Sequence, residues 1–363
     1  MNVQGKHYRS AWWDESEAAL CIVDQTALPH DFRIVSLRSL AEVCDAIRTM
    51  RVRGAPLIGV VAAYGLALAL REDASAQEPA MRDLLATRPT AVNLRWALER
   101  VRDAIAEAAA SERAARALAC AHHLADDDVE VCRAIGANGL TVMREIWQRP
   151  ARDKGRLEIL THCNAGWLAT VDWGTALSAV YQTYDTGIPV HVWVDETRPR
   201  SQGARLTAWE LGQHGVPHTL VSDSSAGHLL QRGLVDLCLV GSDRTTASGD
   251  VCNKIGTYPL ALAAADNRVP FYVALPYSSI DWEIKDALVE IPIERRDGNE
   301  VTHVLGRAAD GAEHTVAISP PSTPAMNFAF DVTPARYVTA LITERGVFPV
   351  NSEGLAALAR ARA

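Results

Sequence analysis

A cysteine and an aspartate stand at chemically useful places in this 363-residue chain, each shortly after an apolar run. Cys163 follows LEILT and precedes a helix-compatible segment, and a thiol near a helix N-terminus tends toward the reactive thiolate. Asp243 follows LCLVG, where apolar walls would raise the pKa of its carboxyl and suit it to general acid catalysis. Each residue also has an ordinary interpretation, because most cysteines are buried and many aspartates cap helices or tighten loops. These two positions alone leave both interpretations open.

Polar residues follow five apolar runs in the second half of the chain, where we predict that strands end. The runs and their polar ends cover residues 157–164, 190–196, 218–224, 237–243 and 271–279. In open parallel sheets, ligands bind in the crevice at the carboxyl ends of the strands. One polar strand end means little, because loops are polar. Five ends that include a thiol, an amide and several acids predict a common binding crevice.

Two segments have the composition of a phosphate site. The string RVRGAP places Arg53 and the amides of Gly54 and Ala55 before an apolar helix, whose N-terminus attracts anions. Asn253 and Lys254 are predicted to stand at the start of a small-residue helix, where lysine serves phosphate as a point charge. The ordinary alternatives are a basic helix cap at the first segment and a solvated lysine at the second.

Other common kinds of site have little support. The sequence contains no GxGxxG or GxxxxGK[ST] loop, so the main signal for a dinucleotide or nucleoside triphosphate is missing. Cys120 and His123 lie one helical turn apart, but a closed metal site needs more ligands, and helix packing explains the pair. No GxSxG elbow indicates a serine hydrolase. We therefore expect an enzyme without metal or cofactor.

Composition and charge restrict the kinds of partner. The chain has 36 basic and 44 acidic side chains, a formal charge of −8, whereas nucleic-acid binders carry basic faces. Its first residues are polar and lack the apolar core of a signal peptide. The alanine-rich run 55–70 predicts a buried helix rather than a membrane span. Seven scattered cysteines without a CxxC pair are typical of reduced thiols, so we expect a cytoplasmic protein with no nucleic-acid or membrane partner.

The elements that must position these residues form two predicted domains. Residues 1–148 are expected to be mainly helical after short N-terminal strands, with helices over 36–50, 91–110 and 112–146. The charged string ARDKGR marks the boundary, and the second domain covers 149–363. Short apolar runs alternate there with helical stretches, which predicts an α/β fold with a parallel sheet covered by helices on both faces.

Several long strings resemble the methylthioribose-1-phosphate isomerase family, within the superfamily of the α, β and δ subunits of the translation factor eIF-2B. The strings include RGAPLIGV, RPTAVNL, THCNAG, VDETRPRSQGARLTAWEL, VGSDRTTASGDVCNKIGTYPLALAA and NFAFDVTPARYVTALITERGV, which together span nearly the whole chain. The resemblance implies a Rossmann-like second domain and a homodimer. It also implies conversion of 5-methylthio-α-D-ribose 1-phosphate to 5-methylthio-D-ribulose 1-phosphate, an aldose–ketose isomerisation in methionine salvage.

The resemblance also implies roles for individual residues. Asp243 matches the proton donor of the family, and Cys163 matches the residue that stabilises the transition state. The substrate-binding positions match Arg53, Gly54, Ala55, Arg88, Gln202, Asn253 and Lys254. We expect Asp243 to protonate the ring oxygen of the sugar. The sequence leaves open whether the C2 hydrogen then moves as a hydride or as a proton.

Two departures from the family pattern lie near the predicted crevice. Ala165 replaces a common threonine, and DSSAG (223–227) replaces DNMAG. They bear on the 5-substituent of the sugar and keep 5-deoxyribose 1-phosphate and ribose 1,5-bisphosphate as alternative substrates. A non-catalytic eIF-2B-like regulatory subunit that binds a sugar phosphate or nucleotide is a further alternative. The presence of both Cys163 and Asp243 favours the enzyme.

Overall fold

The first part of the chain joins a small antiparallel sheet to a group of helices. The computed structural model describes residues 1–88, 92–149 and 155–361. Its first strands are β1 (Asn2–Val3), β2 (Lys6–His7), β3 (Ala11–Asp14), β4 (Ala19–Val23) and β5 (Ile34–Leu37), and β3, β4 and β5 form one sheet. The helices that follow are α1 (Leu40–Arg48), α2 (Ala55–Glu72), α3 (Gln77–Thr87), α4 (Val92–Ile105) and α5 (Ala110–Trp147). The expected helices are present, although residues 36–37 belong to β5 rather than to α1. The helix expected over 91–110 ends at Ile105, and its residue 91 lies outside the described residues.

Helix α2 forms the core of this first part. It is long and apolar enough to cross a membrane, but 78% of its apolar window is buried inside the protein. Its small residues let neighbours approach closely, since a Cβ at Gly59 would lie only 2.7 Å from the carbonyl oxygen of Asn93 in α4. A helix that is apolar all round is expected to be packed on several sides. The prediction of a buried helix is therefore confirmed.

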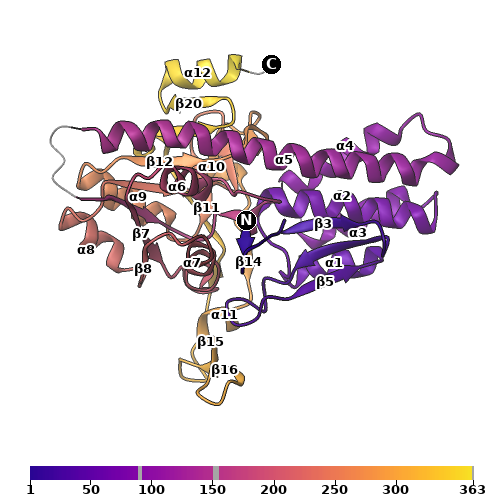
Figure 1. Ribbon diagram of the computed structural model, residues 1–363, viewed down its shortest axis with the longest axis horizontal. Coiled ribbons are helices and arrows are strands. Elements are labelled where there is room, and N and C mark those ends of the chain that lie inside the picture. Colours follow the sequence, from indigo (N-terminus) through magenta and orange to yellow (C-terminus); the bar gives the residue numbers. More distant parts are fainter. Residues whose placement is uncertain (89–91, 150–154, 362–363) are drawn as a thin grey trace.

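Helix α5 connects the two halves of the molecule (Figure 1). Its 38 residues span about 57 Å at the usual rise per residue. The N-terminal half buries Ala117, Ala121 and Leu124 in the same hydrophobic cluster as α2. The C-terminal half buries Val142 and Met143 against the central sheet and α6 (Ala176–Asp185). The predicted division at 148/149 follows the end of α5 and stays a prediction, and residues 151–154 of its ARDKGR string lie outside the described residues.

The second half is built on a sheet whose strand order decides where a ligand can bind. The five predicted strands are β6 (Leu157–Thr161), β7 (Val190–Asp195), β8 (His218–Val221), β9 (Leu237–Val240) and β12 (Phe271–Ala274), and all are parallel neighbours. Two strands not anticipated, β19 (Ala340–Thr343) and antiparallel β20 (Gly346–Pro349), complete the order β20-β19-β12-β9-β6-β7-β8. Counting only the parallel strands in chain order, the arrangement is 3-2-1-4-5-6, that of dinucleotide-binding folds. The prediction of a Rossmann-like parallel sheet is confirmed.

Helices cover both faces of this sheet, as predicted. One face buries Leu157, Ile159 and Val192 with residues of α5, α6 and α7 (Ala208–His214). The other face buries Leu160 and Val240 with residues of α8 (Ser225–Gln231), α9 (Thr257–Asp266) and α12 (Ser352–Arg360). Alternate residues of β6 therefore belong to opposite hydrophobic clusters, because successive side chains of a strand point to opposite faces. Helix α6 starts later than the helix-compatible sequence, after a short turn η1 (Trp167–Ala169) and the positive-φ Gly174.

A second, smaller sheet contradicts one sequence prediction. It has the order β13-β10-β11-β18, with β10 (Arg244–Thr246), β11 (Val251–Lys254), β13 (Ile280–Asp281) and β18 (Phe330–Thr333). Asn253 and Lys254 are the last two residues of β11, and α9 begins only at Thr257, so placing them at a helix start was wrong. The alternation of this short strand is hidden because all four of its residues are buried. The lysine is not solvated, since only 9% of it is exposed.

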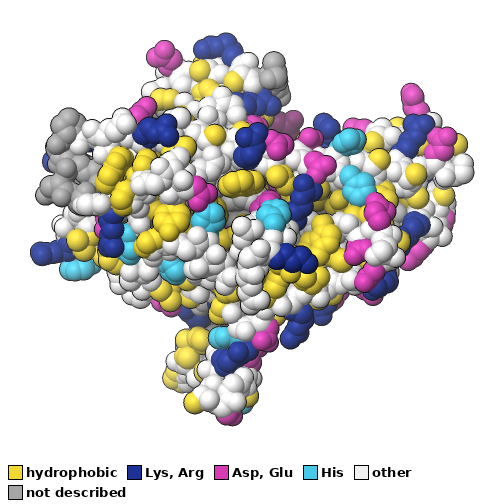
Figure 2. Space-filling model, in the orientation of Figure 1, with side chains coloured by type: hydrophobic (Ala, Val, Ile, Leu, Met, Phe, Trp, Pro, Cys, Tyr) yellow, Lys and Arg dark blue, Asp and Glu magenta, His cyan; other side chains and the backbone are white. Residues whose placement is uncertain are grey.

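The remaining elements form an excursion between β13 and β18. They are α10 (Ala287–Glu290), β14 (Arg295–Arg296), α11 (Asn299–Thr302), β15 (His303–Arg307), β16 (Glu313–Ala317) and β17 (Asn327–Phe328). Short turns precede β13 at Tyr277–Ser279 and follow β18 at Ala335–Tyr337. The β15–β16 hairpin projects from the body of the molecule as an arm (Figure 1). On the face in view in Figure 2, basic and acidic side chains are interspersed over the surface.

Candidate active site

The strand order brings Cys163 and Asp243 to the middle of the sheet. Neighbouring strands β6 and β9 are the first and fourth parallel strands in chain order, and the chain leaves them toward opposite sides. Such a switch point opens a crevice at the carboxyl ends of the two strands. Cys163 lies two residues after β6, and Asp243 lies three residues after β9. Both side chains therefore reach the crevice from the two strands that flank it.

A narrow pocket at this crevice contains every predicted site residue. Its lining includes Arg53, Gly54, Ala55, Arg88, Cys163, Gln202, Asp243, Asn253 and Lys254. The pocket has a volume of about 70 Å³ and adjoins a wider cavity of about 570 Å³ that shares Met50, Arg53 and Gln202 with it. Residues separated by up to two hundred positions in the chain thus face one another in a single site.

The start of α2 provides one end of the pocket. Gly54 is the N-cap of this helix with φ +99°, a conformation that favours glycine, and Pro56 occupies the second helical position rather than the first. A Cβ at Gly54 would lie 2.3 Å from the carbonyl oxygen of Ala169, so glycine also permits a close backbone approach. Arg53 donates to the side-chain oxygen of Asn164 at 2.6 Å and to its main-chain oxygen at 2.7 Å. A helix N-terminus beside an oriented guanidinium can bind a phosphate.

Two further cations and two amides complete this lining. The Arg88 guanidinium is held by Glu294 at 3.0 Å, with only 14% of the arginine side chain exposed. The Lys254 ammonium lies 4.7 Å from the centre of the Phe330 ring, which also lines the pocket. The side-chain oxygen of Gln202 is buried and has no hydrogen-bond partner among the described residues, so it can accept from a ligand hydroxyl.

The electrostatics of the chemical pair favour protonated groups. Burial raises the pKa of Asp243, while Lys254, Arg88 and Arg53 act in the opposite direction. Burial also raises the pKa of the Cys163 thiol, again opposed by Arg53 and Lys254. The prediction of a raised Asp243 pKa is confirmed. Of the two interpretations that the sequence left open for Cys163, the buried thiol fits the structure, because the residue is buried and no α-helix begins directly after it.

The backbone at Cys163 is in a conformation that few residues adopt. Its φ is +65°, and that of Thr197 on the neighbouring loop is +63°. The Cys163 amide donates to the Thr197 hydroxyl at 2.8 Å, and the Cys163 carbonyl accepts from the Thr207 hydroxyl at 2.7 Å. Left-handed conformations of this kind persist only where the surroundings hold them, and they concentrate at functional sites. The two threonines therefore fix the direction of the thiol.

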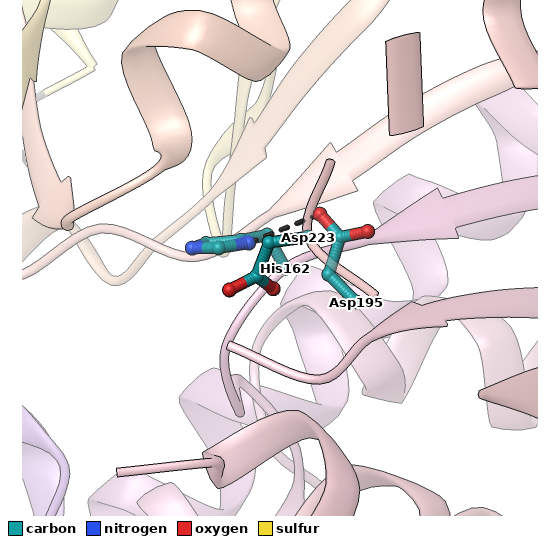
Figure 3. Close-up of side chains that lie close together, drawn as sticks. All are labelled: His162, Asp195 and Asp223. Atoms are coloured by element: carbon teal, nitrogen blue, oxygen red, sulfur yellow. Dashed lines mark hydrogen bonds and ion pairs between the residues drawn. The ribbon is translucent and has the colours of Figure 1, made fainter. Parts of the chain in front are cut away.

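The buried His162, which lines the pocket, lies close to two carboxylates, Asp195 and Asp223 (Figure 3). The ring of His162 has Asp195 at 3.1 Å on Nδ1 and the carbonyl oxygen of Ile255 at 2.8 Å on Nε2. Burial alone would lower the pKa of His162, but Asp195 and the Ile255 carbonyl raise it overall, which favours the imidazolium. The oxygens of Asp223 accept the backbone N–H groups of residues 197 and 198. The three side chains are close enough to hold a cation, but we interpret His162 and Asp195 as an internal ion pair that joins the ends of β6 and β7, while the bond from His162 to the Ile255 carbonyl joins β6 to the end of β11.

The structure also shows where the sequence predictions were incomplete. Of the five polar strand ends, only those after β6 and β9 line the narrow pocket with polar side chains. Residues 195–196 and 222–224 do not line it, and the end after β12 contributes only Pro276, without Tyr277, Ser278 and Ser279. Cys120 and His123 line a separate hollow between α4 and α5. Sequence reasoning missed Glu210, whose carboxyl is fully buried behind Asn164. The sequence feature that could have identified Glu210 is its position in the string TAWEL, where it lies one helical turn after Thr207.

Comparisons with known proteins agree with this geometry. A family model described as "Initiation factor 2 subunit family" matches residues 51–350. The methylthioribose-1-phosphate isomerase of Methylorubrum populi is 58% identical over 360 residues, covering 99% of this chain and 98% of its own. The protein of the same name from Rhodospirillum rubrum is 56% identical over 368 residues, covering 100% and 94%.

Two solved structures have the same fold over nearly their whole length. The 5-methylthioribose 1-phosphate isomerase of Pyrococcus horikoshii OT3 superposes with a TM-score of 0.84 at 38% identity, covering 98% of this chain and 97% of its own. A structure described as translation initiation factor eIF-2B, subunit delta, from A. fulgidus superposes with a TM-score of 0.80 at 38% identity, covering 98% and 100%.

Proposed function

The chain belongs to the methylthioribose-1-phosphate isomerase family, within the initiation factor 2 subunit family, and from this membership we propose how its pocket carries out the reaction. The protein is an intramolecular oxidoreductase of methionine salvage. It converts 5-methylthio-α-D-ribose 1-phosphate to 5-methylthio-D-ribulose 1-phosphate. The observation that carries our proposal is the placement of Cys163 and Asp243 in one pocket, at the switch point of the sheet.

The substrate poses a specific chemical problem. Its anomeric oxygen is esterified, so the ring cannot open spontaneously to a free aldehyde. Breaking the bond between C1 and the ring oxygen requires a proton on that oxygen and stabilisation of the cationic C1 that results. In our proposal Asp243 supplies the proton, since burial keeps its carboxyl protonated at higher pH than usual.

Substrate binding favours the protonated form of Asp243. Arg53, Arg88 and Lys254 each favour the ionised form of Asp243 in the free pocket. A phosphate bound among these cations offsets their charge and adds negative charge of its own. Both effects raise the pKa of Asp243 further, because nearby negative charge disfavours a carboxylate. Asp243 is thus protonated once the substrate is bound.

The C2 hydrogen must then reach C1. In the hydride route it moves with its electron pair to cationic C1, the C2 hydroxyl loses its proton, and that proton restores Asp243. In the enol route a base removes the C2 hydrogen as a proton, and C1 is protonated afterwards. The raised pKa of Cys163 makes its thiolate scarce, which supports the hydride route with the neutral thiol beside C1 and C2. Solvent deuterium at C1 of the product would instead support the enol route.

The other pocket residues bind the substrate in this proposal. Arg53, with the amides of Gly54 and Ala55, receives the phosphate at the N-terminus of α2. Gln202 accepts a sugar hydroxyl through its unpaired buried oxygen. Arg88 and Lys254 add positive charge to the pocket, and Asn253 adds an amide side chain.

We also propose that the protein is a cytoplasmic homodimer. The similarity to isomerases over the whole chain supports this organisation, as do the exposed apolar residues of the arm, including Val316 and Ile318 at 53% and 57% exposure. Sedimentation equilibrium of the purified protein at micromolar concentration tests the dimer. A single species of monomer mass would contradict it.

The activity is tested with purified protein and 1-phosphorylated pentoses that differ only at C5. We expect ketose formation from the 5-methylthio sugar and a much lower kcat/KM for ribose 1,5-bisphosphate, because the arginines of the wider cavity already have partners. Arg200 is paired with Glu300, and Arg205 donates to backbone carbonyls. The variant Asp243→Asn should lower kcat by roughly 100-fold or more with KM largely kept. Asp185→Asn, which alters an exposed carboxylate on α6, is the matched control.

A further inference from the structure

Glu210 of α7 is a fully buried acid that the proposed chemistry does not use. Its side chain has no solvent exposure, and burial raises its pKa to about 7. One carboxyl oxygen accepts a short hydrogen bond from the side-chain amide of Asn164. The other has no partner with full hydrogen-bond geometry among the described residues, although the Leu168 N–H and the Tyr181 hydroxyl lie close enough to the carboxyl to oppose the rise of its pKa. Burying a carboxyl costs free energy of folding. A buried carboxyl beside the pocket therefore suggests a role in function.

The contacts of Asn164 connect this acid to the phosphate end of the pocket. Its amide nitrogen faces two acceptors, Glu210 and the Thr207 hydroxyl at 3.2 Å. The amide oxygen must therefore point the opposite way, where it accepts from Arg53 at 2.6 Å. An asparagine side chain can turn over and exchange its oxygen and nitrogen, and the acceptor at position 210 prevents this. A turned Asn164 would present N–H groups to the guanidinium and repel it.

We propose that Glu210 is a positioning residue, which holds Asn164 in the orientation that aims Arg53 at the substrate phosphate. This inference rests on the phosphate-binding role proposed above for Arg53. Each terminal nitrogen of Arg53 uses one N–H on Asn164 and retains another. The geometry of the retained donors depends on the two bonds to Asn164, and through them on Glu210.

The loop between β6 and α6 is fitted closely around this carboxyl. A Cβ at Gly166 would lie 2.2 Å from one oxygen of Glu210 and 2.6 Å from the other. The loop of Asn164 and Gly166 thus packs directly on the acid. A displaced carboxyl would move the residue that holds Arg53.

The first experiment compares Glu210→Met in the natural chain and in an Arg53→Lys background. Methionine has a similar length but offers no comparable acceptor. We expect Glu210→Met to raise KM for methylthioribose 1-phosphate by up to roughly 100-fold with a smaller change in kcat, because the phosphate is bound in both ground and transition states. In the Arg53→Lys background the same change should alter KM by less than about 3-fold. Equal effects in the two backgrounds would overturn the proposal.

A second experiment exchanges the donor and the acceptor and guards against loss of folding. Asn164→Asp places two carboxyls against each other and should impair binding of the substrate. Adding Glu210→Gln supplies an amide donor to Asp at position 164, so KM should return to within about 5-fold of the natural value. Failure of this rescue, in a double variant that unfolds at the normal temperature, would refute the positioning role.

The control is Glu158→Leu, which removes another buried carboxyl at the opposite end of β6, paired there with His191. It should leave KM unchanged in folded protein. The failure of the proposed function has a different signature. In that case Arg53→Lys alone leaves KM unchanged, whereas failure of the present inference alone leaves the Arg53→Lys defect intact and independent of position 210.

Discussion

Replacing Gly54 by alanine tests the phosphate cradle with a single methyl group. The added Cβ would lie 2.3 Å from the carbonyl oxygen of Ala169, 2.5 Å from its Cα and 2.7 Å from its carbonyl carbon. All three are backbone atoms, so no side chain can rotate away. Since such atoms rest at about 3.5 Å or more, the start of α2 and the turn η1 must separate by about 1 Å.

The magnitude of the effect follows from two separate contributions. At φ +99° an alanine also pays backbone strain of order 1–3 kcal/mol, which lowers the free energy of unfolding. A displacement of about 1 Å at a substrate-binding group can cost roughly 100-fold in rate. Gly54→Ala should therefore lower kcat/KM for methylthioribose 1-phosphate by roughly 100-fold, chiefly through KM.

Gly187→Ala is the matched control for this experiment. Gly187 has φ +85°, but apart from its chain neighbours no atom of the described residues lies within 4 Å of the position of an added Cβ. It should show the backbone strain in thermal unfolding and keep its kcat/KM. Steady-state kinetics and thermal unfolding of both variants separate the two contributions. If Gly54→Ala keeps kcat/KM within about 3-fold of Gly187→Ala, the close approach does not shape the phosphate site.

Further predictions concern the acid, the thiol, the second arginine and the buried ion pair. Because the raised pKa of Asp243 belongs to a group that must be protonated, log kcat should be highest below that pKa and fall as pH rises through it; a pH–rate profile that is the same in Asp243→Asn would contradict the assignment. Cys163→Ser should lower kcat by at least about 10-fold with little change in KM, as measured by steady-state kinetics. A normal kcat in this variant would exclude the thiol from the mechanism. Arg88→Gln should raise KM by roughly 10-fold, and inorganic phosphate should become a weaker competitive inhibitor of the variant to the same extent. Asp195→Asn leaves the buried His162 without its charge partner and should lower the free energy of unfolding by about 3 kcal/mol, measured in urea; an unchanged midpoint would show that the histidine is neutral.

The sequence allowed much of the sheet to be predicted, because its central strands are distinct apolar runs with polar ends. Strands β6, β7, β8, β9 and β12 all lie where the runs predicted them. Strand β19 was missed because its apolar run is followed at once by β20, and β11 was missed because its residues resemble the start of the next helix. Such short segments become strands through pairing with distant partners, which local sequence does not encode. The domain division at 148/149 stays a prediction.

The candidate site was predicted from residue types and motif resemblance, and the structure adds its electrostatics. By itself the sequence determined which residues are chemically capable and that strand ends gather them, since alternating strands and helices permit few arrangements. Only the tertiary structure decided that Cys163 is a buried thiol rather than a reactive thiolate at a helix N-terminus, and that Lys254 is enclosed beside Phe330. It alone brought Glu210 behind Asn164, forty-six positions away in the chain. Protonation and side-chain orientation depend on burial and on neighbours from distant segments, and these exist only once the chain has folded.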